Sequence, residues 1–187
     1  MFQSVKASLA GFGRFSELEM DAVTARLQFR EVKKNGCLVV EGQICQSFYF
    51  INRGSFRHYT ALENGSDAVL NLYVEKDWLF EYKSFITQTP SVNRIQAAEE
   101  SEIFELSGWD FHELVRSSGT FFQIGHIFER AIQNQDYQNN RLSPEEKYAL
   151  LITTKPQIIQ KFPLKQIASY LGMAPETLSR IRRKSIS

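Results

Sequence analysis

The sequence contains only two cysteines, Cys37 and Cys45, among its 187 residues. Two thiolates cannot supply the four ligands of an iron–sulfur cluster or a structural zinc site, and one disulfide is a thin framework for a secreted chain of this length. We therefore interpret both cysteines as small buried apolar residues. The sequence predicts no metal site.

Long apolar runs are also missing. No segment approaches the roughly 18 uninterrupted apolar residues of a membrane-spanning helix. Near the N-terminus, Gly11, Gly13 and Arg14 interrupt the apolar run that a secretory signal requires. We expect a cytoplasmic protein that has no membrane partner.

Motifs of the common enzyme classes are absent as well. The three histidines, His58, His112 and His126, stand alone, and none belongs to a His-Glu-x-x-His motif. The sequence also lacks a Gly-x-Ser-x-Gly nucleophile motif and a phosphate-binding glycine loop. We therefore expect no enzyme and assign no catalytic residue. Trp78 and Trp109 are interpreted as core residues.

The net charge of +1 conceals an uneven distribution along the chain. Residues 1–140 contain 13 Lys and Arg against 18 Asp and Glu, a net charge of −5, whereas residues 141–187 contain nine against three, a net charge of +6. A short basic segment behind a larger acidic one suits a nucleic-acid-binding module on a regulatory domain. Ordinary variation in surface charge is the alternative.

Glycine and proline separate at the same place. Nine of the ten glycines precede Asn140, and four of the five prolines follow it. The glycines separate β-branched and aromatic runs that are typical of antiparallel strands. These runs are residues 37–40, 47–52, 68–74 and 101–106. In the later part, Ser143, Pro144 and Glu146 match an N-cap, a first-turn proline and a capping-box glutamate. The pattern predicts an α+β protein with an antiparallel β domain followed by short helices.

Residues 119–140 show helical spacing of apolar side chains. Phe121, Ile124, Phe128 and Ala131 follow one another at intervals of three and four. A helix of this extent is roughly 33 Å long, more than one small β domain needs to cover a face. We expect these four residues to contact a second copy of the chain in a two-fold dimer. A helix packed wholly against its own domain is the alternative.

Residues 163–184 predict two helices joined by a tight turn. Ala168 is small where two crossing helices approach each other, and Gly172 suits a turn that needs positive φ. Pro175 fits the first turn of the second helix. The shared apolar face consists of Ile167, Leu171, Leu178 and Ile181.

The outer face of the second helix carries side chains that read DNA bases. Arg180 suits a bidentate contact with guanine, Glu176 can accept from a cytosine amine, and Thr177 can bond a phosphate or touch a thymine methyl. The other basic residues are interpreted as phosphate contacts: Arg182, Arg183 and Lys184. The alternative is a helical hairpin whose arginines are merely solvated.

Two segments resemble a known family. Residues 38–54, with Gly42, Cys45 and Gly54, resemble the first signature of cyclic-nucleotide-binding domains, and residues 163–184 resemble the helix-turn-helix of the Crp/Fnr transcription regulators. The resemblance implies an N-terminal β-roll (double-stranded β-helix), which begins near residue 15 and ends near residue 107. By the same resemblance, Glu176 and Arg180 read bases.

The resemblance also implies a domain order and partners. A sensor domain is expected over residues 1–118, a dimerisation helix and hinge over 119–142, and a DNA-binding domain over 143–187. The expected partners of such a bacterial regulator are an inverted-repeat operator in double-stranded DNA, a second copy of the chain and RNA polymerase. Because little chain follows Lys184, we do not expect the β-hairpin wing that often follows the recognition helix.

The ligand site departs from the family pattern. Phe80 stands where nucleotide-binding members have a glycine beside the phosphate, and Ser91 stands where they have an arginine. One neutral hydrogen bond in place of a charge-assisted bidentate pair weakens binding by about 2 kcal/mol or more in a sheltered site. We therefore expect no response to cyclic AMP, and an unidentified small-molecule effector or none. The expected pocket residues are Phe80, Glu81, Tyr82, Ser91 and Val92.

Arg94 does not restore the missing arginine. It lies three residues after Ser91, so on a strand it points to the opposite face and is a poor substitute.

The oxygen-sensing branch of the family is disfavoured, because its cluster needs cysteines that this chain lacks. The alternative function is a sensor of a cyclic nucleotide or another small molecule whose C-terminal tail binds a protein partner.

Overall fold

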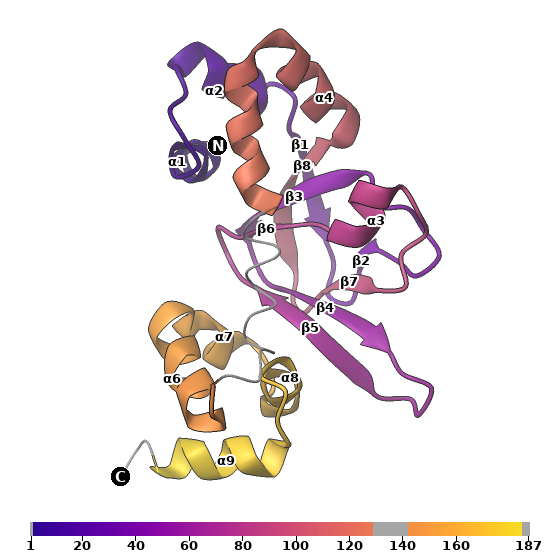
Figure 1. Cartoon of the computed structure of the whole chain (residues 1–187), viewed down its shortest axis with the longest axis vertical. Coiled ribbons are helices and arrows are strands. Elements are labelled where there is room, and N and C mark those ends of the chain that lie inside the picture. The colour runs from indigo at the N-terminus through magenta and orange to yellow at the C-terminus, as the bar shows by residue number, and fades with distance from the viewer. Residues whose placement is uncertain (1, 129–141, 185–187) are drawn as a thin grey trace.

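The structure is a computed structural model that describes residues 2–128 and 142–184. It consists of a β-rich body with helices at one end and a helical unit at the other (Figure 1). The antiparallel sheets and separate helices confirm the predicted α+β class. The domain boundaries remain predictions.

Two short helices precede the sheets. They are α1 (Gln3–Ala10) and α2 (Glu17–Thr24). The side chain of Ser16 accepts a hydrogen bond from the Glu19 N–H, and the Glu19 carboxylate accepts one from the Ser16 N–H, so a capping box begins α2. The expectation that the β-roll begins near residue 15 is therefore wrong, because this local signal starts a helix there.

In the described part of the chain, eight strands form two four-stranded sheets in which every pair is antiparallel. One sheet has the order β1-β8-β3-β6 and the other the order β2-β7-β4-β5. All four predicted runs fall on strands, namely β2, β3, β5 and β8. The strands are β1 (Gln28–Val32), β2 (Cys37–Val39), β3 (Ser47–Arg53), β4 (Phe56–Ala61), β5 (Asp67–Tyr73), β6 (Trp78–Leu79), β7 (Arg94–Ala97) and β8 (Ser101–Ser107).

The turn between β3 and β4 requires glycine. Gly54 has a φ of 106°, and a Cβ atom there would lie 2.1 Å from Ser101 Oγ. Any larger residue would therefore combine backbone strain with a clash. This close approach lets β4 leave β3 and enter the second sheet.

Three helical segments accompany the sheets. α3 (Tyr82–Thr87) lies between β6 and β7, whereas α4 (Gly108–Ser117) and η1 (Gly119–Gly125) follow β8. The expected long helix therefore begins as a 3₁₀ helix, followed by helical residues 126–128. The rest of the expected helix, residues 129–140, lies outside the described residues.

Four helices form the C-terminal unit: α6 (Pro144–Thr154), α7 (Pro156–Lys161), α8 (Leu164–Tyr170) and α9 (Pro175–Lys184). Ser143 caps α6, Glu146 completes the capping box, and Pro144 occupies its first turn, as the sequence predicts. Pro175 likewise begins α9. The predicted helix starts are therefore confirmed.

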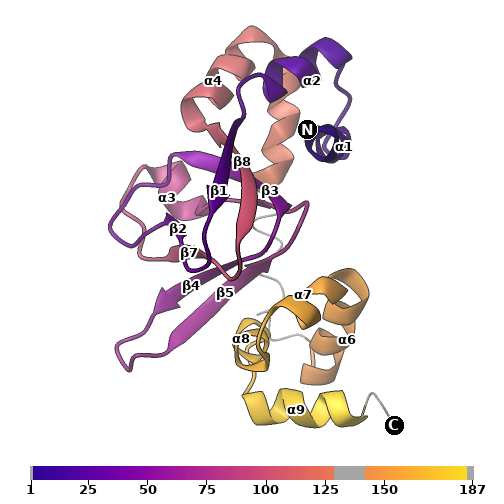
Figure 2. The same ribbon diagram turned by 180° about the vertical axis from the view of Figure 1, so that it is seen from behind.

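The buried side chains form two clusters. The first fills the β-rich body and the N-terminal helices. The second joins the outer face of β5 to the C-terminal helices, and its members from β5 and the residue after it are Val69, Leu72 and Val74. Figures 1 and 2 both show α8 beside β5. The helical unit is thus packed on the second sheet.

Candidate functional site

The turn between α8 and α9 is built as the sequence predicts. Gly172 has a φ of 68°, Ala168 is fully buried, and the Met173 N–H donates to the Ala168 carbonyl across 3.0 Å. Buried Lys147 on α6 donates from Nζ to the Leu171 carbonyl, 3.3 Å away. A cation thus stabilises the C-terminal end of α8 just before α9 begins.

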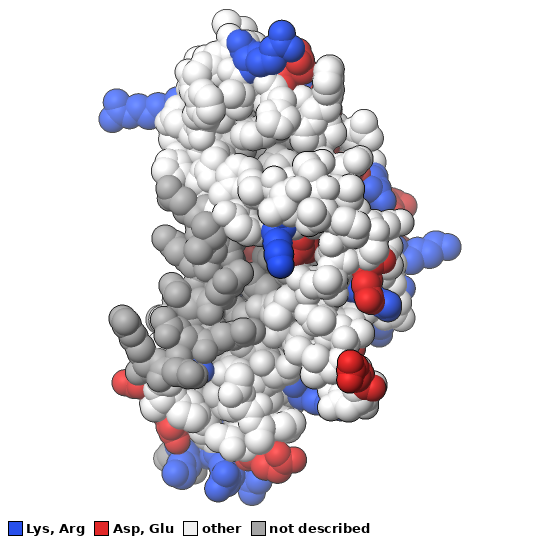
Figure 3. Space-filling model, turned by 45° about the vertical axis from the view of Figure 1, so that its right-hand side comes forward, with Lys and Arg blue, Asp and Glu red and all other residues white. Residues whose placement is uncertain are grey.

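Helix α9 has one buried face and one exposed face. Leu178 and Ile181 are buried in the second cluster. Glu176, Arg180 and Arg183 are exposed on the other side. In Figure 3, positive side chains gather at the end of the molecule that α9 forms. The helix therefore presents both a carboxylate and guanidinium groups to the solvent.

All six predicted DNA-contact residues lie on α9. Thr177 and Arg182 are half-buried, and Lys184 is exposed. Arg180 Nη2 donates to Thr177 Oγ1 across 3.4 Å, and within residues 2–128 and 142–184 no ion pair joins Arg180 or Arg182 to a carboxylate. The guanidinium groups of Arg180 and Arg182 can therefore form an ion pair with an external anion. Their roles at base and phosphate remain predictions.

A shallow groove of about 450 Å³ runs beside the N-terminal half of α9. Its lining residues are Leu164, Pro175, Glu176, Ser179, Arg180 and Arg183. The groove brings the start of α8 to the same surface as the exposed face of α9. Both helices of the motif can therefore meet one polyanion.

Glu81 occupies the centre of the expected ligand site, but its carboxylate is already paired. One carboxylate oxygen accepts from the Ser84 N–H and thereby caps α3, and the other accepts from Asn93 Nδ2 across 3.0 Å. Thr60 Oγ1 donates in turn to Asn93 Oδ1, 2.6 Å away. Glu81 is only 4% exposed. A ligand hydroxyl would have to displace these bonds.

Ser91 is engaged in the same way. Its hydroxyl donates to the Asn93 carbonyl and accepts from the Asn93 N–H, both across 2.9 Å. Arg94 does not replace the missing arginine, because its Nη2 donates to the Glu41 carboxylate on the outside of the roll. Val92 is 63% exposed. Neither Ser91 nor Val92 presents a free group to an enclosed ligand.

Phe80 is enclosed by other aromatic rings. Its ring centroid lies 5.0 Å from that of Phe48, 5.3 Å from that of Phe128 and 5.6 Å from that of Phe85. Tyr82 adds an edge contact at 6.1 Å. A packed ring thus occupies the position at which a glycine would admit a phosphate. These residues are thus packed, internally bonded or exposed, and their role in binding a ligand remains a prediction.

The inside of the roll also holds a buried histidine, His58, which belongs to no sequence motif. His58 is 9% exposed, and its Nε2 atom has no hydrogen-bond partner among the described residues. Burial lowers the pKa of His58 to about 4, although the nearby Glu81 charge acts in the opposite direction. The two-residue spacing from Phe56, which is also buried on β4, was the available signal.

The expected dimer residues have different surroundings. Phe121 and Ile124 on η1 are 2% and 1% exposed, in the core of their own domain. This corrects the expectation that they contact a second copy, because their own chain covers them. Phe128 is half-buried and packs against the same core, and Ala131 lies outside the described residues.

Polar contacts fix the C-terminal unit to the second sheet. Ser169 Oγ on α8 accepts from the Val69 N–H across 3.0 Å. Lys155 Nζ lies 2.9 Å from Asp77 Oδ2, and Lys161 Nζ lies 2.6 Å from Glu99 Oε1. These contacts flank the apolar cluster on β5. The helix-turn-helix and the β-roll thus share one interface in this structure.

The structure describes no metal site. Within residues 2–128 and 142–184, no group of three His, Cys, Asp or Glu side chains could hold an ion.

Cys45 is buried, and burial raises the pKa of its thiol. Cys37 is only half-buried, so the predicted burial is confirmed for Cys45 alone. Among the described helices, none is long and apolar enough to cross a membrane.

Residues 29–118 match the family model described as cyclic nucleotide-binding domain. Residues 29–118 are therefore similar to cyclic nucleotide-binding domains. The match covers the strands, α3 and α4, and it ends just before η1. No curated protein sequence matches the chain.

The similarity to solved structures includes the C-terminal helices as well as the β-rich body. The catabolite activator protein of Thermus thermophilus is 18% identical with a TM-score of 0.59, over 95% of this chain and 85% of that one. FixK2 from Bradyrhizobium japonicum is 12% identical with a TM-score of 0.68, over 84% and 83%. The c-di-GMP responsive regulator CLP of Xanthomonas campestris is 13% identical with a TM-score of 0.60, over 90% and 91%. The fold is that of the Crp/Fnr transcription regulators, as the sequence resemblance indicated.

Proposed function

We propose that the protein is a sequence-specific DNA-binding transcription regulator of Crp/Fnr type that acts as a homodimer. The observation that carries this proposal is the orientation of α9. Its apolar face, formed by Leu178 and Ile181, is buried. On the opposite side, Glu176, Arg180 and Arg183 are exposed beside the groove. These side-chain types at this spacing suit the edges of bases in a major groove.

Base reading and phosphate binding are assigned to different residues of α9. Arg180 and Glu176 are exposed in the first two turns, where a recognition helix meets base edges. The phosphate contacts are assigned to Arg182, Arg183 and Lys184 in the last turn. Thr177 bonds Arg180 in the free protein and orients its guanidinium.

The proposed dimer places two recognition helices in successive major grooves, about 34 Å apart, so the operator is an inverted repeat. Because Phe121 and Ile124 are buried in their own domain, the dimer contacts are assigned to Phe128, Ala131 and the exposed side chain of Phe122, which is 69% exposed. Sedimentation velocity tests the dimer directly. A monomer at every concentration would contradict this part of the proposal.

Cyclic AMP is not the proposed effector. Phe80, which stands where the family pattern has a glycine beside the phosphate, packs against Phe48, and Glu81 and Ser91 form hydrogen bonds with Asn93. Arg94 does not supply the missing positive charge, because it forms an ion pair with Glu41 on the outside of the roll. RNA polymerase remains the proposed partner at the promoter.

Selection of duplexes from a random DNA pool tests this function. Purified full-length protein is used with and without cyclic AMP, and Arg180→Ala protein is the matched control. We expect an inverted repeat to be enriched equally in both wild-type arms, with altered or relaxed preference in the control. Enrichment only with cyclic AMP would contradict our interpretation of Phe80 and Ser91.

A salt titration of binding to an arbitrary duplex separates the remaining possibilities. A DNA-binding surface gives an affinity that falls steeply with salt, because bound phosphates release counterions. A C-terminal unit that binds a protein partner instead gives no enriched sequence and a weak, flat response. That result would overturn the proposal.

A further inference from the structure

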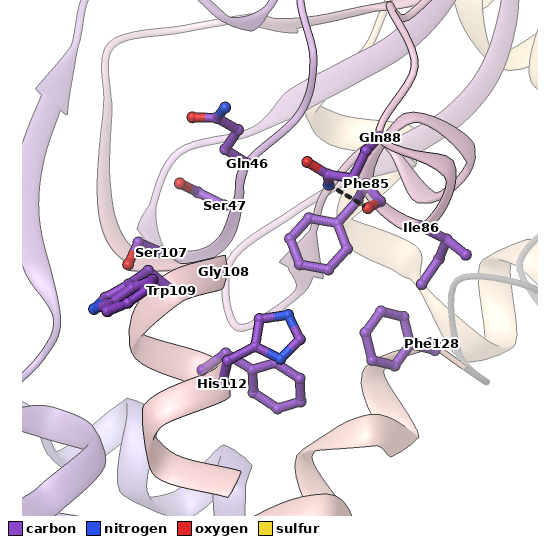
Figure 4. A pocket seen from close by; sticks show the side chains of 11 residues that line it. Gln46, Ser47, Phe85, Ile86, Gln88, Ser107, Gly108, Trp109, His112 and Phe128 are labelled. Carbon is purple, nitrogen blue, oxygen red and sulfur yellow. Dashed lines mark hydrogen bonds between the residues drawn. The ribbon is translucent and has the colours of Figure 1, made fainter. Parts of the chain in front are cut away.

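A cavity of about 650 Å³ lies beside α3 and α4. It is bounded by the start of β3, the C-terminal half of α3, the first turns of α4 and Phe128 (Figure 4). Its volume is within the range of roughly 300–1,000 Å³ that small-molecule sites occupy. None of the predicted pocket residues lines it.

Aromatic side chains form most of the wall. Phe85 and Phe111 are buried in it, Phe128 closes one side, and Trp109 stands at the opposite edge (Figure 4). Trp109 is 74% exposed, so the interpretation of this tryptophan as a core residue is wrong. An exposed indole buries little apolar surface when the chain folds, but beside a concave aromatic surface it can stack on a flat ligand.

The polar groups of the cavity are amides, hydroxyls and one imidazole. Gln46 and His112 line it, and neither of their side chains makes a hydrogen bond within the described part of the chain. Gln88 keeps its carbonyl oxygen available, because only its Nε2 is used, in a bond to the Phe85 carbonyl. These groups can therefore orient a ligand without breaking existing bonds.

No Lys, Arg, Asp or Glu is among the described residues that line this cavity. A phosphate or carboxylate placed against the aromatic wall would lose water without gaining a counter-charge, and so would an ammonium group. The charge pattern thus disfavours nucleotides and favours a neutral molecule. A flat body suits the space between Trp109 and the rings of Phe85 and Phe128.

We propose that this cavity binds an uncharged, flat aromatic molecule, which stacks on Trp109 and hydrogen-bonds to Gln46 and His112. The site has a direct connection to the rest of the chain, since the Phe128 ring also contacts Phe80 and Phe48, with centroids 5.3 Å and 5.5 Å apart. Only a regulatory consequence of binding rests on the proposed DNA-binding function. The binding site itself does not.

Two fluorescent probes with the same ring system test the proposal. N-phenyl-1-naphthylamine is neutral, whereas 1-anilinonaphthalene-8-sulfonate carries a negative charge. Each is titrated into the full chain without DNA, so failure here is distinguishable from failure of the proposed function. We expect saturable binding of one neutral probe per chain and at least about tenfold weaker binding of the anionic probe.

Variants at exposed positions locate the site without risk to the fold. Trp109→Ala and Ile86→Ser change side chains that are 74% and 52% exposed and line the cavity. Each substitution is expected to lower the affinity for the neutral probe at least about fivefold. Leu18→Ala removes an apolar side chain that is 82% exposed but lies outside the cavity, and is expected to leave the affinity unchanged.

Three results would overturn the proposal. They are equal affinity for both probes, unchanged affinity in Trp109→Ala, and loss of probe binding as the protein concentration rises. The last would mean that a second copy of the chain occupies the aromatic surface. Isothermal calorimetry with the neutral probe provides the stoichiometry independently of fluorescence.

Discussion

Lys155 Nζ lies 2.9 Å from Asp77 Oδ2, and this ion pair joins the helical unit to the turn that follows β5. Asp77 also accepts from the Val74 N–H across 3.0 Å, so the carboxylate is held in place before the lysine reaches it. The two side chains are 20% and 23% exposed. A pre-oriented, largely sheltered pair of this kind contributes more than a mobile pair on the surface.

Removal of this ion pair is expected to loosen the contact between the two units. A double-mutant cycle with Asp77→Asn and Lys155→Met should give a coupling free energy of about 1 kcal/mol in urea unfolding. The matched control is the exposed pair Arg116–Glu113 on α4, where the coupling should be about 0.3 kcal/mol. Equal couplings would show that the interface adds nothing to the pair.

Truncation of Leu72 tests the apolar part of the same interface. Leu72 is fully buried in the cluster that β5 shares with the C-terminal helices. Leu72→Ala should lower the free energy of unfolding by about 2–5 kcal/mol, because it removes buried methyl groups and leaves a cavity. Leu62→Ala, at a position 44% exposed, should change it by less than about 0.5 kcal/mol. A change as small at Leu72 would argue against the shared core.

Buried His58 predicts a stability that depends on pH. Its pKa is about 4 in the folded protein and about 6.5 in an unfolded chain, so the unfolded chain binds more protons between these values. The stabilisation is complete above about pH 6.5 and declines as the pH falls toward 4, by up to about 3 kcal/mol.

Urea unfolding at pH 7 and pH 5 checks this expectation. The loss of stability should be clearly smaller in His58→Gln than in the wild type, because the buried imidazole is gone. His112→Gln changes an exposed histidine and should keep the wild-type pH dependence. Identical pH dependence in the wild type and His58→Gln would contradict the burial of a neutral His58.

Arg180 and Arg182 are expected to fail in different ways when replaced. Arg180→Ala should cost about 1–3 kcal/mol at one base pair and relax the choice there, because a bidentate contact with a base is lost. Arg182→Ala should weaken binding to all sequences about equally and reduce its salt dependence. Binding measured on single-base operator variants distinguishes these outcomes, and equal loss of preference in both variants would refute the assignment.

Cyclic AMP is expected to bind no more tightly than a Kd of about 1 mM. No guanidinium stands at Ser91, and the Glu81 carboxylate is engaged by Asn93. Calorimetric titration of the full chain with the nucleotide checks this. Saturable binding in the low micromolar range would contradict it and would require the Glu81–Asn93 bond to open.

Local signals in the sequence predicted much of the fold correctly. The capping box of Ser143 and Glu146, the positive φ of Gly172 and the buried positions Leu178 and Ile181 were all confirmed. Each depends on residues within about one or two helical turns, where hydrogen bonding and periodicity act directly. The same kind of signal at Ser16 and Glu19 was available and was missed.

The surroundings of individual side chains were predicted less well. Trp109 is exposed rather than buried, and Phe121 and Ile124 pack into their own domain rather than facing outward. Apolar spacing shows that a face of a helix is buried, but it does not show which surface covers that face. The bond between Asn93 and Glu81 was missed for a similar reason, because no local spacing indicates that these two side chains meet.

The sequence by itself determined the order of elements, the helix-turn-helix and the two faces of α9, because short-range periodicity, caps and turn residues specify them. Only the tertiary structure decided three further features. They are the docking of α8 on β5, the hydrogen bond between Asn93 and Glu81, and the cavity beside Trp109. Each joins residues that lie apart in the sequence, 12 positions for Glu81 and Asn93 and 100 for Val69 and Ser169. Such contacts depend on how whole surfaces fit together, which no local pattern in the chain encodes.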